Sequence, residues 1–174
     1  MKCLINSYKV KCPVGEYNVE QCEEGLHRVK LENYNENRDI DRGEEVEMIE
    51  NDDSEEPEFV EWLREYFVKS QKFFKLELPR VCETVFDSDK FRQRVWREIY
   101  LNLSFGQTAS YGEVARRVGS AGASQSVGTA MKNNPVSLVI PCHRVVRAGG
   151  DPGHYHGGDM DNLKIWFLSH EQDC

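Results

Sequence analysis

The segment Val136–Val146 constrains the fold of this chain more than any other part of the sequence. Its first part, Val136–Ile140, carries no charge and is mostly aliphatic, which favours a short strand buried on both faces. Pro141 has no backbone N–H to donate, so regular pairing should stop there. The sequence therefore predicts a buried strand whose end presents the next residue, Cys142.

The neighbours of Cys142 point to a reactive thiol rather than a structural one. An isolated cysteine is more often an inert buried side chain. Here His143 can serve as a base and Arg144 favours an anionic neighbour, a setting that lowers the pKa of a thiol. Because adjacent side chains of an extended strand point to opposite faces, a turn or a bridging water must connect Cys142 with His143.

The composition is that of a globular protein. With 174 residues, 39% of them hydrophobic, the chain can bury a core in one domain or in two small ones. No segment approaches the ~18 apolar residues of a membrane span, and the first residues lack the apolar core of a signal peptide. We therefore expect an intracellular protein whose cysteines are reduced thiols rather than a disulfide framework.

The net charge of −8 is distributed very unevenly. Residues 36–58 hold twelve acids and two arginines, whereas residues 90–147 hold nine bases and two acids. The basic half contains Cys142, so a polyanion would be attracted to that half. The acidic stretch, about 33–57, is poor in aromatic residues, and we expect a solvated insert without regular structure.

Period-two alternation predicts a small antiparallel sheet, with strands around Leu4–Val10, Tyr17–Glu20 and Leu26–Leu31. After the insert, Pro57 marks the start of a helix. Its apolar residues recur at helical spacing and predict a core-facing stripe: Phe59, Trp62, Leu63, Tyr66 and Phe67. Residues 76–86 are interpreted as a connection between two halves, and we place the domain boundary near Thr84.

The basic half contains a predicted helix-turn-helix. Ser88 can cap a preceding helix, whose apolar stripe is Phe91, Val95, Trp96 and Ile99. Ser110 and Glu113 fit a capping box that opens a short helix ending at Gly119, and Ser124 can cap a second helix over residues 125–133. Two short helices joined by a glycine-containing turn in a basic region favour DNA binding.

A glycine-rich stretch, residues 149–158, follows the thiol and contains His154, Tyr155 and His156. So much glycine around polar aromatic side chains predicts a pocket-forming loop rather than core. The last helix is predicted to start at Asp161 or Asn162. The side chains expected to face inward from it are Leu163, Trp166, Phe167 and Leu168.

Four motifs together resemble the O6-alkylguanine-DNA alkyltransferases: Pro141-Cys142-His143-Arg144-Val145, Asn134-Pro135, Ser110-Tyr111 and His170-Glu171. The resemblance implies an α+β fold. A ribonuclease-H-like sheet domain would occupy residues 1–84 and include the acidic insert, and a helix-turn-helix (winged-helix-like) domain would occupy residues 85–174. It also implies that Cys142 takes the alkyl group from O6-alkylguanine, and from O4-alkylthymine, flipped out of DNA, and keeps it.

The same resemblance implies roles for individual residues. His143 would take the thiol proton through a water, Glu171 would orient that imidazole, and Asn134 would fix the turn beneath the site. Tyr111 would donate to N3 of the departing guanine. The residues expected to contact substrate or DNA are Gln125, Arg144, Val145, Tyr155, His156, Ser110, Ser124 and Lys132.

Three positions depart from the family pattern. Gln125 stands where members usually carry an arginine that fills the gap left by the flipped base, and glutamine lacks that cation. His156 replaces a serine of the pocket loop. Ser137 replaces a second proline that some members have before the active cysteine.

Cys3, Cys22, His27 and Cys82 form a candidate structural zinc site. Spacing alone offers only the pair Cys22 and His27, five positions apart. Some animal members of the family hold zinc with two N-terminal cysteines and two histidines. Three of those positions match here, and Cys82 replaces the second histidine, a change that zinc accepts. No organic cofactor is expected.

Two other functions compete with repair. A lesion-binding relative would sense alkylated DNA without turnover, but such relatives lack the cysteine. A cysteine hydrolase or thiol redox enzyme would leave the helix-turn-helix unexplained. We therefore expect a DNA repair protein, monomeric in solution, whose partner is double-stranded DNA containing O6-alkylguanine and whose location is the nucleus.

Overall fold

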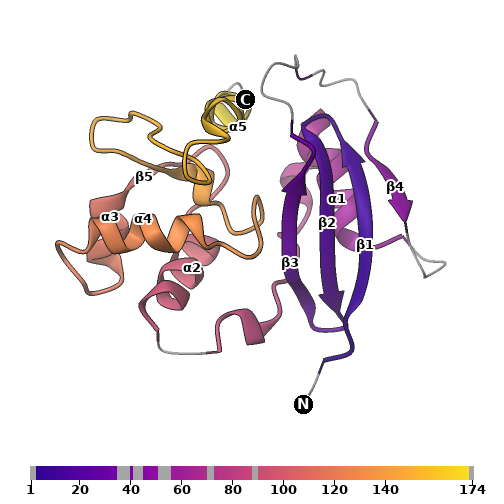
Figure 1. Ribbon diagram of the computed structural model, residues 1–174, viewed down its shortest axis with the longest axis horizontal. Coiled ribbons are helices and arrows are strands. Elements are labelled where there is room, and N and C mark those ends of the chain that lie inside the picture. The colour runs from indigo at the N-terminus through magenta and orange to yellow at the C-terminus, as the bar shows by residue number, and fades with distance from the viewer. Residues whose placement is uncertain are drawn as a thin grey trace. The chain divides into compact units, whose positions relative to one another are not determined.

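The computed structural model describes residues 3–34, 40, 45–50, 56–69, 73–87 and 90–172. The chain divides into two compact units, Met1–Thr84 and Val85–Cys174. The first is built on an antiparallel sheet and the second mainly on helices, so the fold is α+β (Figure 1). Within the described residues, no helix combines the length and apolar character that crossing a membrane requires.

The sheet of the first unit has the strand order β3-β2-β1-β4. Its strands are β1 (Asn6–Cys12), β2 (Gly15–Cys22), β3 (Gly25–Glu32) and β4 (Glu47–Glu50). Every neighbouring pair is antiparallel, which confirms the sheet predicted from alternation. The first strand begins later than predicted, because Leu4 is 83% exposed and offers no apolar side chain to the core.

The prediction that the whole acidic stretch lacks regular structure was wrong for Glu47–Glu50. This segment pairs with β1 through backbone hydrogen bonds, which do not depend on side-chain polarity. Val46, just before the strand, is buried and supplies an apolar anchor in an otherwise charged segment. Residues 35–39, 41–44 and 51–55 of the stretch lie outside the described residues.

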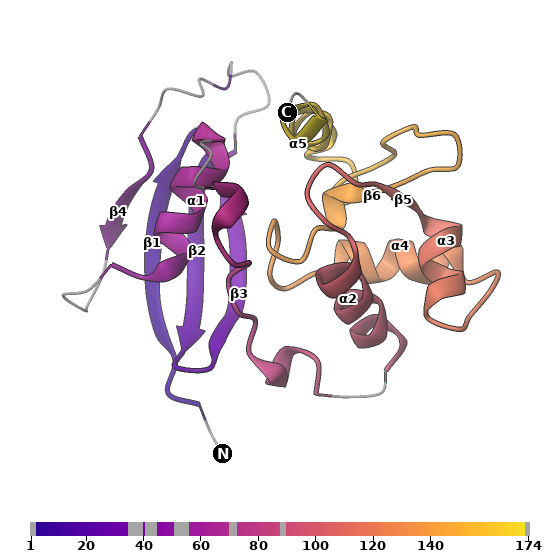
Figure 2. The same ribbon diagram turned by 180° about the vertical axis from the view of Figure 1, so that it is seen from behind.

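Helix α1 (Glu58–Val68) covers one face of this sheet, as Figure 2 shows from behind. Pro57 lies at its N-cap position, as predicted. The apolar stripe predicted for this helix is buried. The rings of Tyr17 in β2 and Phe59 meet edge-on with their centroids 6.4 Å apart, and those of Trp62 and Tyr66 stack with their centroids 5.3 Å apart. Aromatic burial of this kind stabilises a small core strongly.

The connection after α1 contains two short 3₁₀ turns, η1 (Phe73–Lys75) and η2 (Glu83–Val85). Between them the chain runs beside the start of β3. Leu26 donates its N–H to the Arg80 carbonyl at 2.8 Å, and its own carbonyl accepts from Cys82 at 2.9 Å. Those two hydrogen bonds fix Cys82 next to the β2–β3 turn.

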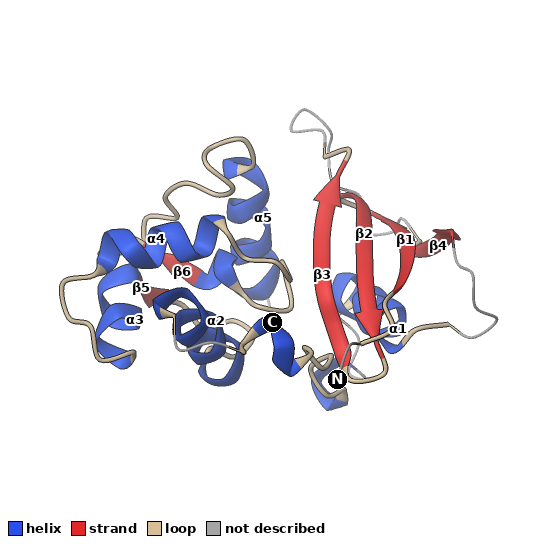
Figure 3. Ribbon diagram, turned by 60° about the horizontal axis from the view of Figure 1, so that its bottom comes forward, coloured by secondary structure: helices blue, strands red, loops and turns tan. Residues whose placement is uncertain are grey.

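The second unit contains α2 (Phe91–Asn102), α3 (Tyr111–Arg117), α4 (Ser124–Lys132) and α5 (Asp161–Gln172) (Figure 3). Two short strands, β5 (Ala109–Ser110) and β6 (Val145–Val146), pair in parallel. Helix α4 packs against both α2 and α3, and the Trp96 indole donates to the Ala130 carbonyl at 2.8 Å. The predicted pair of short helices is therefore present.

The helix starts agree with the sequence only in part. Ser110 and Glu113 form the predicted capping box at α3. Ser88 lies outside the described residues, and Lys90 occupies the N-cap position of α2 without a side-chain cap. The assignment of Ser124 as a cap was wrong: Ala123 occupies that position, and Ser124 is the first helical residue.

The run Val136–Ile140 is buried as predicted, but it forms a tight turn rather than a strand. Ile140 donates its N–H back to the Val136 carbonyl at 2.9 Å, and Leu138 takes a left-handed conformation with φ of 71°. Such a conformation is costly for a branched residue and persists only where its surroundings fix it. The side chain of Asn134 provides that fixing, because it bonds to both ends of the turn.

Candidate active site

Cys142 is the first residue of a 3₁₀ turn, η3 (Cys142–Arg144), and this residue is 2% exposed. The side chain of Asn134 contacts the sulfur of Cys142. The Asn134 amide nitrogen lies 3.1 Å from Sγ and donates to the Ile140 carbonyl at 2.8 Å, while the amide oxygen accepts from the Val136 N–H at 3.0 Å. Asn134 thus joins the two ends of the turn that precedes the thiol.

The structure overturns the expected lowering of the thiol pKa. Burial raises the pKa of Cys142, and its hydrogen bonds with Asn134 and Tyr155 offset this only in part. The expected electropositive neighbour does not face the sulfur, because the Arg144 guanidinium is bound to Glu171 and to the Leu103 carbonyl. The resting thiol is therefore protonated and needs a base.

His143 and Arg144 both bind Glu171. His143 Nε2 lies 2.7 Å from Glu171 Oε1, and the guanidinium of Arg144 is bidentate on the same carboxylate, at 2.7 and 3.0 Å. All three side chains are buried. Burial alone would raise the pKa of Glu171, but the positive charge of Arg144 and the hydrogen bonds from His143 and Arg144 outweigh it and hold that pKa well below its usual range.

The His143 imidazole is neutral at rest and can accept a proton. Burial lowers its pKa more than the Glu171 carboxylate raises it. With Nε2 on Glu171, the other ring nitrogen, Nδ1, is buried and has no hydrogen-bond partner among the described residues. Glu171 therefore orients the ring so that Nδ1 is the nitrogen available as a base.

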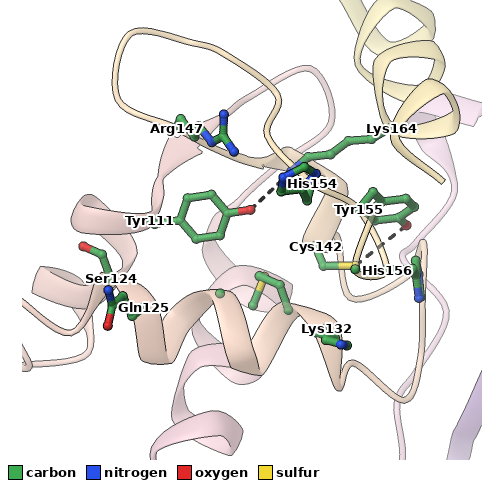
Figure 4. Close-up of a pocket in the computed structure, with 13 residues that line it drawn as sticks. Tyr111, Ser124, Gln125, Lys132, Cys142, Arg147, His154, Tyr155, His156 and Lys164 are labelled. Atoms are coloured by element: carbon green, nitrogen blue, oxygen red, sulfur yellow. Dashed lines mark hydrogen bonds between the residues drawn. The ribbon is translucent and has the colours of Figure 1, made fainter. Parts of the chain in front are cut away.

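A pocket of about 490 Å³ opens above Cys142 (Figure 4). The sequence prediction named seven of its lining residues: Tyr111, Ser124, Gln125, Lys132, Cys142, Tyr155 and His156. The remaining predicted residues do not line this pocket. Asn134, His143, Arg144, Val145 and Glu171 lie buried in the same unit, while Ser110 caps α3.

His154 and Gly157 also line the pocket and belong to the stretch 149–158 that was predicted to form one. Sequence reasoning missed four other lining residues: Gly128, Met131, Arg147 and Lys164. Lys164 is the most unusual, because it is a lysine with 1% exposure. A signal for it did exist in the sequence. Lys164, Phe167 and Glu171 lie three and seven positions apart, which places all three on one face of a helix. That face is the buried one.

The first unit brings together the four predicted metal ligands. The ligand atoms of Cys3, Cys22, His27 and Cys82 all lie within 4.8 Å of one another. Sγ of Cys3 and Sγ of Cys82 are 3.9 Å apart, close to the about 3.8 Å that two zinc-bound thiolates adopt at Zn–S distances of about 2.3 Å. Three thiols and one imidazole are also a donor set that suits zinc.

A neighbouring hydroxyl orients this cluster. Thr84 Oγ1 lies 3.3 Å from His27 Nδ1 and 3.2 Å from Cys82 Sγ, while His27 Nε2 faces Cys22 Sγ at 3.1 Å. With Nδ1–H donating to Thr84, Nε2 is left as the metal-binding nitrogen. The residues present therefore fit a bound zinc ion.

Comparison with known proteins shows the family to which this sequence is similar. Residues 90–173 match the DNA-binding domain of 6-O-methylguanine DNA methyltransferase. A methylated-DNA–protein-cysteine methyltransferase of Mus musculus is 34% identical over 97% of this chain and 82% of its own length. One of Mycobacterium leprae is 38% identical over 70% of this chain and 77% of its own length.

The solved structures agree. An O6-methylguanine methyltransferase of Mycobacterium tuberculosis aligns with a TM-score of 0.68 and 26% identity over 98% of this chain and 94% of that one. Another structure, described as that bacterium's OGT in complex with DNA, aligns with a TM-score of 0.68 and 27% identity over 95% of this chain and 91% of that one. With its buried Pro-Cys-His-Arg site, the chain belongs to the methylated-DNA–protein-cysteine methyltransferase family.

Proposed function

We infer that this protein repairs DNA by moving an alkyl group from O6 of guanine to the sulfur of its own Cys142. The observation that carries this inference is the position of that thiol. It lies at a pocket of about 490 Å³ within the residues that match the DNA-binding domain of the family. The reaction consumes the protein, because a thioether is a poor leaving group, so each molecule acts once.

The alkylated base lies inside the stack, so the nucleotide must flip out to reach the pocket, at a cost of a few kcal/mol. Phosphate contacts from the basic half would help to offset that cost. A flipped guanine would lie against Tyr155, with backbone carbonyls of Cys142 and Val145 accepting from its exocyclic amine. O4-alkylthymine offers the same type of electrophilic carbon and is a second substrate.

Proton transfers make the displacement possible. His143 takes the thiol proton through a water, and Glu171 stabilises the imidazolium that forms. The thiolate attacks the alkyl carbon in line with the C–O6 bond. Negative charge then develops on the guanine, and the Tyr111 hydroxyl donates to N3 to stabilise it. His156, Ser124 and Lys132 contact the flipped nucleotide or its phosphates.

Incubation with duplex DNA containing O6-methylguanine, followed by peptide mass spectrometry, tests this function. The expected result is one added methylene group on the Cys142 peptide in stoichiometric yield. A sensor of alkyl lesions is the second candidate, since the same pocket would hold the flipped base. Tight binding of the modified duplex with Cys142 left unmodified would favour the sensor and contradict repair.

We also propose that the cluster Cys3, Cys22, His27 and Cys82 holds a structural zinc ion. The site ties the segment before β1 to the connection after α1, so metal binding should stabilise the first unit rather than take part in chemistry. Three further assignments belong with the proposed function: a ribonuclease-H-like topology for the first unit, a winged-helix-like one for the second, and the nucleus as the location.

Replacing Cys82 with serine should lower bound zinc from one equivalent to well below it, and should lower the melting temperature. Zinc bound to small domains contributes on the order of 10 kcal/mol to folding, so the shift should be large. The matched control is Cys12→Ser, which removes a buried thiol of the same unit that donates to the Gly15 carbonyl and lies outside the cluster. Less than one equivalent of zinc in unmodified protein purified without chelator would contradict the assignment.

A further inference from the structure

The buried amine of Lys164 connects two groups that the proposed reaction uses. Its Nζ donates to the Val145 carbonyl at 2.7 Å and to the Tyr111 hydroxyl at 3.4 Å. Figure 4 shows Lys164 reaching from α5 toward that hydroxyl across the pocket. In the described part of the chain, a carbonyl and a hydroxyl hold this ammonium, not a carboxylate. A buried cation in such a setting retains its charge only with difficulty.

Burial makes the proton of Lys164 mobile. Burial lowers the pKa of Lys164 to about 8, although the charges of Cys142 and Asp161 raise it. The titratable or charged groups that act on Lys164 or face it are Tyr111, Cys142, His143, Arg147, Asp151 and Asp161. At neutral pH the amine is therefore mostly protonated, yet its proton can leave at little cost.

We propose that Lys164 is a positioning residue behind Tyr111, and that it replaces the proton that the Tyr111 hydroxyl gives to the departing guanine. This inference rests on the proposed function. A phenol is a weak acid, and burial raises the pKa of Tyr111, as does the negative charge at Cys142. Alone, Tyr111 would finish the reaction as a buried phenolate, a costly product. A proton from Nζ removes that cost.

The proton balance of the step is complete. The Sγ–C bond forms, the C–O6 bond breaks, and its electron pair remains on the guanine. N3 takes the proton of the Tyr111 hydroxyl, that oxygen takes one from Lys164 Nζ, and Lys164 ends as a neutral amine. The thiol proton ends on His143.

Alkyl transfer itself triggers the release of the Lys164 proton. The thiolate of Cys142 raises the pKa of Lys164 while it exists. Once alkylated, the sulfur carries no charge and no longer raises the pKa of Lys164. The ammonium therefore becomes more acidic at the moment when the guanine needs a proton. The Val145 carbonyl, with two lone pairs, can keep its bond from Nζ while accepting from the guanine amine.

The test compares two electrophiles for Cys142. Free O6-benzylguanine needs a proton on its leaving group, whereas iodoacetamide releases iodide and needs none. We divide the rate constant for O6-benzylguanine by that for iodoacetamide. Both reactions need the thiolate, so the degree of ionisation of the thiol cancels in this ratio. In the unmodified protein we expect this ratio to be constant below pH 8 and to fall about ten-fold per pH unit above it, as Lys164 loses its proton.

Lys164→Met should lower the ratio by roughly 10²-fold and abolish its pH dependence, while the iodoacetamide rate stays within a few-fold. Tyr111→Phe should do the same, and the double variant should lose no more than either single one. Lys30→Met, which removes an exposed lysine of the first unit, should change neither rate.

Three outcomes would contradict the inference: a ratio independent of pH in the unmodified protein, equal loss of both rates in Lys164→Met, or additive losses in the double variant. The first needs no substitution, so the inference stays testable even if Lys164→Met fails to fold. A failure of the unmodified protein to accept any alkyl group from guanine would instead overturn the proposed function.

Discussion

Cys142→Ser should abolish alkyl transfer completely and leave binding to duplex DNA within a few-fold of the unmodified protein. The serine hydroxyl is far less acidic than a thiol and a much poorer nucleophile toward an alkyl carbon. We expect DNA affinity to come mainly from phosphate contacts of the basic half, which the substitution leaves unchanged. Mass spectrometry and fluorescence anisotropy measure the two properties separately.

Cys12→Ser is the matched control here also, because it replaces another buried thiol that is not among the residues lining the pocket. It should transfer methyl groups at the unmodified rate. Methylation of any other cysteine in Cys142→Ser at a comparable rate would show that Cys142 is not the acceptor. A parallel loss of DNA affinity would show that the thiol supports the fold of the DNA-binding surface.

Glu171→Gln should destabilise the protein by about 3 to 5 kcal/mol and slow alkyl transfer without abolishing it. The buried Arg144 guanidinium would keep its charge while its bidentate partner lost the opposite one. Transfer should continue slowly, because a thiol still ionises to a small extent without an oriented base. Denaturant unfolding and single-turnover kinetics measure the two effects.

The matched control is Glu56→Gln, which also breaks a bidentate carboxylate–arginine pair, with Arg64 in the first unit. That pair is exposed, with side-chain exposures of 42% and 44%, so its loss should cost at most about 1 kcal/mol. Equal costs for the two substitutions would mean that burial does not strengthen the Glu171 contacts. Transfer at the full rate in Glu171→Gln would remove Glu171 from the mechanism.

The depressed pKa of Glu171 also gives the sign of a pH effect. A carboxyl group whose pKa is lower in the folded state stabilises the protein above its unfolded pKa of about 4.3. This contribution disappears as pH falls through the folded value. The stability difference between the unmodified protein and Glu171→Gln should therefore be constant near neutral pH and shrink below about pH 4.

Local sequence patterns correctly predicted the elements that are specified by residues close together in the sequence. Alternation identified the three strands β1 to β3, and the capping box of Ser110 and Glu113 identified the start of α3. The roles of Asn134 and Glu171 came from the family resemblance rather than from a local pattern, and the two side chains do reach the turn and the imidazole.

The errors arose where distant contacts override local preference. The aliphatic run Val136–Ile140 has the composition of a strand, but the Asn134 side chain captures its backbone groups and folds it into a turn. Arg144 was predicted to stabilise the Cys142 thiolate only because the two residues are close in the sequence. Its true partner is Glu171, twenty-seven positions along the chain. Lys164 was overlooked because a lysine is rarely buried.

The buried, protonated state of Cys142 also bears on how long an unreacted molecule survives in a cell. Oxidants such as peroxide attack thiolates that are exposed to solvent, and convert them to sulfenic acid and higher oxides. A thiol with 2% exposure and a raised pKa resists that attack, so molecules awaiting a lesion keep their single acceptor intact. Burial therefore has two effects: it makes a base necessary for alkyl transfer, and it protects the thiol of unreacted protein from oxidation.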